Sequence, residues 1–238
     1  MVIDKNRIVI GFLILTFFII GYFFKLDLFI LFSISTLIIY ELYKSSFLTK
    51  SYNVYITLIV FIIIFPLIYY QNQIINFFNI LIIFIVLIMI LFPNFYFKKL
   101  FLLVVLIFIH NFFSIYYYDR NILYFVIFTA FFNDTIAYIA GKIIKGPPIM
   151  PSISPNKTWS GTIVSFICSF ILIIQFNIFP IIAILLSISL FFGDIFFSFI
   201  KRKINLKDFS NFLQGHGGIL DRLDSMFFFI IILNFYYL

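Results

Sequence analysis

The dominant pattern along this chain is a series of long apolar runs separated by short polar breaks. A helix needs about 20 apolar residues to cross the roughly 30 Å hydrocarbon core of a bilayer, and most of the runs approach that length. The pattern therefore predicts an all-α, polytopic integral membrane protein with about nine transmembrane helices, in a single membrane domain. The predicted spans are 7–24, 28–43, 54–70, 77–97, 100–118, 121–141, 161–178, 179–200 and 219–238.

Positive charge is unevenly divided between the two sides that nine spans define. With the N-terminus in the cytoplasm, all of the 16 Lys and Arg residues except Lys25 and Arg120 fall on the cytoplasmic side. This asymmetry follows the positive-inside rule. Membrane topology therefore accounts for much of the net charge of +7, and no nucleic-acid partner is needed to explain it. The same asymmetry predicts that the polar C-terminal segments face the cytoplasm.

Composition supports the same class of protein. Hydrophobic residues make up 64% of the chain and charged residues 11%, against roughly 25% charged in soluble domains. Residues 1–120 contain few groups capable of chemistry, so we interpret them as a scaffold and residues 121–238 as the catalytic half. Glu41, at the end of the second span, is interpreted as an interfacial residue. His110 and Asn111 are interpreted as hydrogen-bonding groups that face the interior of the bundle.

The stretch from Asp194 to Ser225 has the most unusual polar pattern. Asp194 lies inside an apolar run, and Ser198, Lys201 and Arg202 follow at spacings that share one helical face. A polar loop and the start of the last span continue this pattern with Lys207, Asp208, His216, Gly217, Gly218, Asp221, Arg222 and Asp224. The acids at 221 and 224 are expected to share a helical face. Carboxylates beside cations at the water edge of a membrane predict metal-assisted chemistry on a phosphorylated substrate.

A second polar region begins in the sixth span. Asp134 is an ionisable residue within an apolar segment, which marks it as a candidate functional residue, with an ion pair to a nearby lysine as the alternative. The following loop contains four prolines between 147 and 155 and is expected to be stiff and extended. Its end offers hydroxyl groups, a cation and backbone amides near a helix start, all suited to phosphate oxygens.

Both regions resemble the motifs of the phosphatidate cytidylyltransferases, also called CDP-diacylglycerol synthases. The C-terminal motif is carried by Ser198, Ile200, Lys201, Arg202, Lys207, Asp208, Ser210, His216, Gly217, Gly218, Ile219, Asp221, Arg222, Leu223 and Asp224. The upstream motifs are carried by Asp134, Ala137, Tyr138, Ser154, Pro155, Lys157, Thr158 and Trp159. The chain departs from the usual pattern at Gln214, at Ser160 and in the segment 145–148.

The resemblance implies a nucleotidyltransferase of phospholipid biosynthesis that uses CTP and phosphatidate and releases CDP-diacylglycerol and pyrophosphate. It implies a bacterial-type inner membrane location, a homodimer, and Mg²⁺ as cofactor, with room for a second, monovalent cation. Asp194 and Asp221 would hold the metal, with Asp224 in support. The catalytic residues would be Asp194, Asp221, Lys201, Arg202 and Arg222. The substrate-binding residues would be Asp134, Tyr138, Ser154, Lys157, Thr158, Ser198, Lys207, Asp208, His216, Gly217 and Gly218.

Two other classes of function stay open from the sequence. A CTP-dependent polyprenol or lipid kinase, or an archaeal-lipid cytidylyltransferase, would share the nucleotide chemistry but give a different lipid product. A transporter would favour polar residues at the midplane and two related halves. The charges here cluster at one face and in the C-terminal half, which favours the transferase.

Overall fold

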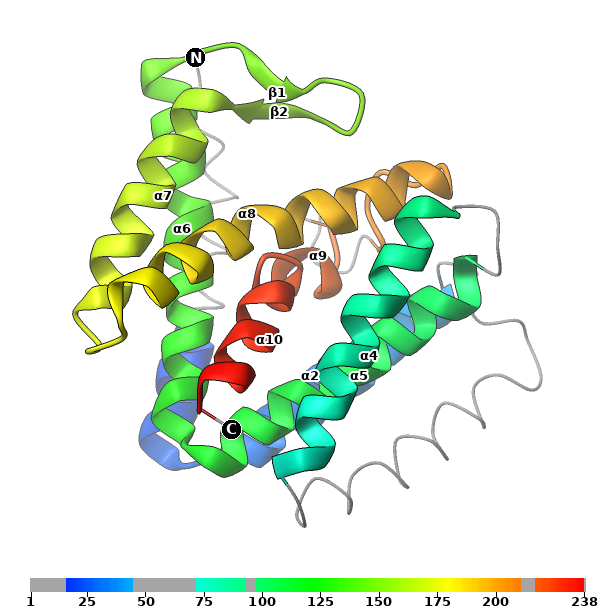
Figure 1. Ribbon diagram of the computed structural model, residues 1–238, viewed down its shortest axis with the longest axis vertical. Coiled ribbons are helices and arrows are strands. Elements are labelled where there is room, and N and C mark those ends of the chain that lie inside the picture. Colours follow the sequence, from blue (N-terminus) through cyan, green and yellow to red (C-terminus); the bar gives the residue numbers. More distant parts are fainter. Residues whose placement is uncertain (1–15, 45–71, 93–96, 211–216, 238) are drawn as a thin grey trace. The chain divides into compact units, whose positions relative to one another are not determined.

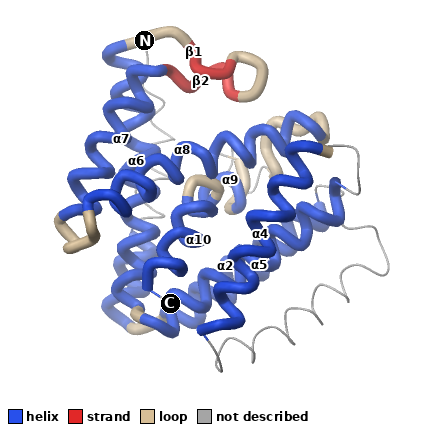
Figure 2. The backbone as a smooth tube through the Cα atoms, viewed as in Figure 1, coloured by secondary structure: helices blue, strands red, loops and turns tan. Residues whose placement is uncertain are grey.

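The computed structural model describes residues 16–44, 72–92, 97–210 and 217–237 (Figure 1). Over these residues the chain is helical apart from one two-stranded hairpin and the connecting turns (Figure 2). Three of the described helices are long and apolar enough to cross a membrane: α5 (Phe97–Tyr118), α6 (Arg120–Ile144) and α8 (Pro180–Lys203). The all-α class is confirmed and the chain is an integral membrane protein, while the count of nine spans stays a prediction.

The chain divides into two compact units. The N-terminal unit comprises residues 1–124 and 208–222, and the C-terminal unit comprises residues 125–207 and 223–238. The first unit therefore includes a C-terminal segment that carries part of the predicted motif. Each unit is described by itself below.

In the N-terminal unit, α2 (Asp27–Lys44) and α4 (Asn72–Leu91) both pack against α5. Phe101, Phe108 and Phe113 of α5 are fully buried, so large aromatic side chains form the centre of this packing. His110 and Asn111 are also buried, in agreement with the predicted interior position.

The predicted spans of this unit match the helices to different degrees. The second span, 28–43, matches α2 closely. The fourth span, predicted at 77–97, is displaced, because α4 begins at Asn72 and ends at Leu91. The third span, 54–70, lies outside the described residues, and the first is described only from residue 16.

The C-terminal unit contains the greater part of α6, the hairpin, α7 (Trp159–Ile174), α8 and α10 (Met226–Tyr237). Helix α8 packs against both α7 and α10 (Figure 1). Pro180 begins α8 at a position where its missing N–H costs no hydrogen bond. The three cations at the other end of α8 lie where the helix dipole favours positive charge.

The proline-rich loop folds into the hairpin. Strand β1 (Pro148–Met150) pairs antiparallel with β2 (Ser154–Thr158), which confirms the predicted extended segment. Gly161 brings α7 very close to α6, because a Cβ at this position would lie 2.5 Å from the carbonyl oxygen of Ala137. The hairpin is thus attached to a tightly packed pair of helices.

The last predicted span, 219–238, is interrupted. Helix α9 covers only Leu220–Leu223, and Asp224 and Ser225 form a turn before α10 begins. The expectation that Asp221 and Asp224 share one helical face is therefore wrong, since the helix ends between them. Gly193 of α8 packs onto this turn, and a Cβ there would come within 2.9 Å of the carbonyl oxygen of Ser225.

Candidate active site

The C-terminal unit holds a cluster of carboxylates, each beside a donor or a cation. The ammonium group of Lys157, in β2, contacts Oδ2 of Asp194, in α8. The hydroxyl of Ser198, one turn further along α8, donates to Oδ1 of Asp194 at 3.4 Å. About a quarter of each side chain in the ion pair is exposed, at 23% for Lys157 and 25% for Asp194. The pair therefore remains accessible to a ligand.

A second pair lies deeper in the same unit. Nζ of Lys201 is 3.9 Å from Oδ2 of Asp224, and these side chains are only 10% and 5% exposed. The backbone N–H of Ser225 donates to Oδ1 of Asp224 at 2.8 Å, and the hydroxyl of Ser225 donates to Asp134 at 3.4 Å. A buried cation is costly unless it has a partner, so Asp224 stabilises Lys201 in place.

The residues around the hairpin position Lys157. Thr158, the next residue, is the N-cap of α7, and its hydroxyl accepts a hydrogen bond from the N–H of Gly161 at 3.2 Å. Nε of Arg202, at the end of α8, donates to the carbonyl oxygen of Ile153 in the hairpin turn at 3.1 Å. In this structure Thr158 and Arg202 thus make structural hydrogen bonds that hold the hairpin.

In the N-terminal unit, the motif loop is built around Asp221. Its Oδ2 accepts hydrogen bonds from the backbone N–H groups of Gly218 at 2.8 Å and of Phe209 at 3.0 Å. Gly217 has a φ of +76°, a conformation that glycine adopts without strain. Gly218 was predicted to bind substrate, and in this structure its amide donates to a carboxylate of the chain itself.

Glu41 makes contacts that the sequence interpretation did not predict. It was interpreted as an interfacial residue, and the structure adds that only 1% of it is exposed. Its Oε1 accepts from the hydroxyl of Ser210 at 2.8 Å and from the N–H of Ile219 at 2.7 Å, while Oε2 accepts from the N–H of Leu220 at 3.0 Å. An ionisable residue near the end of an apolar span was the available signal, and the same rule that marked Asp134 applies to it.

The remaining predicted site residues lie in different parts of the structure. The hydroxyl of Tyr138 accepts a hydrogen bond from Lys142 within α6. Ser154 lies in β2, Asp208 and Arg222 are half-buried in the N-terminal unit, and Lys207 is exposed. His216 lies outside the described residues.

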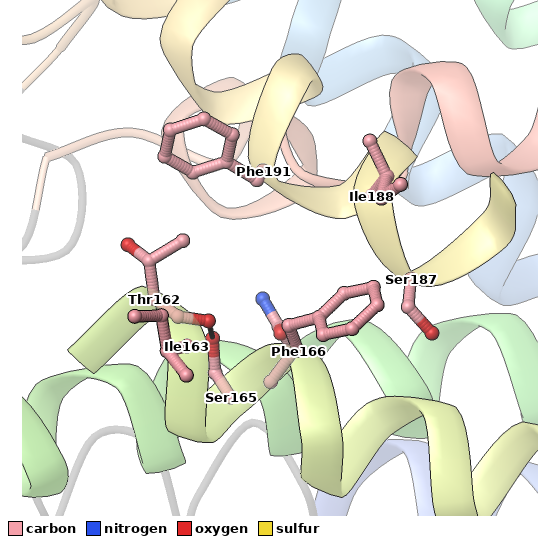
Figure 3. Close-up of a pocket in the computed structure, with 8 residues that line it drawn as sticks. Thr162, Ile163, Ser165, Phe166, Ser187, Ile188 and Phe191 are labelled. Carbon is pink, nitrogen blue, oxygen red and sulfur yellow. Dashed lines mark hydrogen bonds between the residues drawn. The ribbon is translucent and has the colours of Figure 1, made fainter. Parts of the chain in front are cut away.

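A cavity of about 260 Å³ opens between α6, α7 and α8 of the C-terminal unit. Phe191 and Ile188 of α8 lie across it from Thr162 and Phe166 of α7 (Figure 3). It is lined by Asn133, Thr162, Ile163, Ser165, Phe166, Ser187, Ile188 and Phe191. The hydroxyls of the two lining serines donate to backbone carbonyls of their own helices, so the wall is mainly apolar. Lys157 lies 5.6 Å from the ring centre of Phe191, which places the cavity next to the Lys157–Asp194 pair.

The metal-binding prediction concerns Asp194, Asp221 and Asp224. Within the described ranges, no three or more His, Cys, Asp or Glu side chains form a group that could hold a metal ion. Mg²⁺ is commonly held by only one or two carboxylates, with waters and substrate phosphates completing the shell. The carboxylates of Asp194 and Asp224 fit a site of that kind, and Mg²⁺ stays a prediction.

Comparisons with known proteins agree on one family. The sequence model of the cytidylyltransferase family matches residues 5–238. The chain is 37% identical over 109 residues to a phosphatidate cytidylyltransferase of Rickettsia typhi, covering 39% of this chain and 48% of that protein. It is 40% identical over 120 residues to one of Staphylococcus saprophyticus, covering 46% of each chain. These alignments span about half the length of the curated relatives.

Proposed function

The chain belongs to the cytidylyltransferase family, and from that premise we propose that it transfers the cytidylyl group of CTP to phosphatidate. A phosphate oxygen of phosphatidate attacks the α-phosphorus of CTP, and the bond from that phosphorus to the oxygen bridging to the β-phosphorus breaks. The products are CDP-diacylglycerol and pyrophosphate. The observation that carries the proposal is the pair of lysine–carboxylate contacts in the C-terminal unit, Lys157 with Asp194 and Lys201 with Asp224.

The cations of this cluster suit a reaction between two polyanions. The ammonium groups of Lys157 and Lys201 offset the repulsion between the lipid phosphate and the triphosphate, and then the charge that develops on pyrophosphate. Before substrate binds, their carboxylate partners keep both ammonium groups neutralised and fixed in position. A phosphate monoester is already largely ionised near pH 7, since its second pKa is about 6, so no general base is needed.

The proposed metal site belongs to this reaction. Asp194 and Asp224, both in the C-terminal unit, are the carboxylates that would be available to Mg²⁺ there. Asp221 stays a ligand predicted from the sequence. When bound, the ion would supply Lewis-acid stabilisation of the phosphoryl oxygens. Arg222 would bind a phosphate, and its planar guanidinium suits paired hydrogen bonds to two oxygens.

The apolar cavity beside Phe191 offers a place for the start of a phosphatidate acyl chain. Ile188 lines it and Ile184 does not, although both lie on α8, one turn apart, and both are more than a third exposed. Ile188→Trp should raise the KM for a long-chain phosphatidate about tenfold, because the indole would fill the cavity. The KM for a short-chain, water-soluble phosphatidate should change less than about twofold.

Ile184→Trp is the matched control, and it should leave both KM values near those of the wild type. Equal effects of the two substitutions on both lipids would contradict the proposal that an acyl chain binds in this cavity.

The active-site side is proposed to be cytoplasmic. Ser152 in the hairpin turn and Asn177 after α7 are exposed and lie beyond opposite ends of one apolar helix. In right-side-out vesicles, a membrane-impermeant thiol reagent should label Asn177→Cys and spare Ser152→Cys, in a background where Cys168 is replaced by Ala. In inverted vesicles the order should reverse. Labelling of Ser152→Cys from the outside would contradict the orientation.

A further inference from the structure

The loop that carries the motif residues of the N-terminal unit has two protein carboxylates beneath it. Asp221 accepts the N–H groups of Phe209 and Gly218, and Glu41 accepts those of Ile219 and Leu220. In the described contacts both oxygens of Glu41 accept hydrogen bonds, from two backbone N–H groups and one hydroxyl. Glu41 therefore holds the two residues that directly precede Asp221 in the chain.

The fit between Glu41 and the loop is close. A Cβ added at Gly218 would lie 2.5 Å from each of the two Glu41 oxygens. A side chain at Gly218 would force the Glu41 carboxylate to move from its present position. Gly218 thus has a structural reason to be glycine that does not depend on a bound phosphate.

The short helix that follows needs such support. Helix α9 has four residues. An isolated helix of one turn is unstable, because the entropy lost in forming the first turn exceeds the free energy gained from its hydrogen bonds. The first N–H groups of any helix also lack partners within it. Glu41 supplies partners for two of these groups from α2, at a separation of 178 residues for Ile219 and 179 for Leu220.

We propose that Glu41 is a positioning residue for the transfer reaction. By fixing the backbone of Ile219 and Leu220, it sets where Asp221 and Arg222 point. The inference rests on the proposed function for its effect on catalysis, whereas the anchoring of the loop is a separate and measurable property. It gives the scaffold helix α2 a direct part in the geometry of the motif loop.

The same helix provides a matched control. Asp27, at the other end of α2, is also a buried carboxylate, with 3% exposed. It accepts hydrogen bonds from Arg120 at 3.1 Å and Tyr124 at 2.6 Å and touches no part of the motif loop in the described contacts. If Glu41 served only the stability of the fold, Glu41→Gln and Asp27→Asn should have similar consequences.

The test uses the full chain in lipid nanodiscs with both substitutions. In Glu41→Gln, one oxygen becomes an NH₂ group that cannot accept, so a buried donor loses its partner. The kcat for cytidylyl transfer should fall about 30-fold, while the KM for CTP changes less than about threefold. Amide hydrogen exchange over residues 217–223 should become faster. Asp27→Asn should leave kcat within about threefold and exchange over 217–223 unchanged.

The outcomes separate the anchoring of the loop from the reaction. Unchanged exchange over 217–223 in Glu41→Gln, or losses of kcat equal to those of Asp27→Asn, would overturn the proposal. If the wild-type chain shows no cytidylyl transfer at all, the proposed function fails, and the exchange measurement still decides whether Glu41 anchors the loop. Should Glu41→Gln fail to fold, Ser210→Ala removes the hydroxyl that donates to Oε1 of Glu41 and keeps the carboxylate itself. Faster exchange over 217–223 in that variant supports the anchor, and unchanged exchange contradicts it.

Discussion

Asp194→Asn is expected to lower the rate of cytidylyl transfer about a thousand-fold while the protein stays folded in the membrane. The substitution preserves the shape of the side chain but removes the charge that contacts Lys157 and accepts from Ser198. Loss of a charged group that orients cations at a reacting phosphate costs several kcal/mol, and about 4 kcal/mol corresponds to this factor. The measurement is the turnover number at saturating CTP and phosphatidate.

Two controls identify the reason for the loss. Asp119→Asn changes a carboxylate that caps the N–H of Asn121 in the connection between α5 and α6, and it should retain most of the activity. The double variant Asp194→Asn with Lys157→Gln removes both members of the ion pair. The double variant is compared with Lys157→Gln alone, because loss of Lys157 is itself expected to lower turnover. If Asp194 did no more than neutralise Lys157, the double variant would be as active as Lys157→Gln. We expect the double variant to be clearly less active.

Lys201→Gln is expected to lower turnover about a hundred-fold, the cost of removing one preorganised charge or donor at a developing negative charge. Lys201 is buried beside Asp224, so its ammonium group cannot be replaced by a solvent-exposed cation nearby. The substitution also removes a positive charge beside the buried carboxylate of Asp224, which is itself destabilising. Turnover and the midpoint of thermal unfolding are measured on the same preparations.

Lys203 provides the comparison, since it is the same residue type in the last turn of the same helix but is exposed. Lys203→Gln should change turnover less than about twofold, because surface charges contribute little. Similar losses in the two variants would mean that only the total charge of this helix end matters. The specific role of Lys201 would then be withdrawn.

The helices that were predicted closely are those whose ends coincide with local signals. The span predicted at 28–43 became α2, Asp27–Lys44, with an acid in its first turn and a base in its last. The span predicted at 121–141 became α6, Arg120–Ile144. The length of an apolar run and the charges at its ends are local properties, so these helix bounds can be predicted from the sequence. Helix α4 starts earlier than predicted because a helix can continue through polar residues that a membrane span would exclude.

The parts that were missed depend on contacts between distant residues. No local pattern shows that Glu41 bonds to residues 210, 219 and 220. The break after Leu223 likewise depends on Gly193, which lets α8 approach the turn at Asp224. The contact between Lys157 and Asp194 joins the two polar regions of the sequence within the C-terminal unit, and it too links residues far apart in the chain. The role of His216 and the homodimer stay predictions.

The central claim is that the cytidylyl group, and not a terminal phosphate, is transferred to the lipid. Purified protein in nanodiscs is given phosphatidate, Mg²⁺ and CTP that carries label on either the α- or the γ-phosphorus. The account predicts that α-label enters the lipid fraction as CDP-diacylglycerol and that γ-label is recovered as pyrophosphate. Entry of γ-label into the lipid, with release of CDP, would identify a lipid kinase and contradict the account.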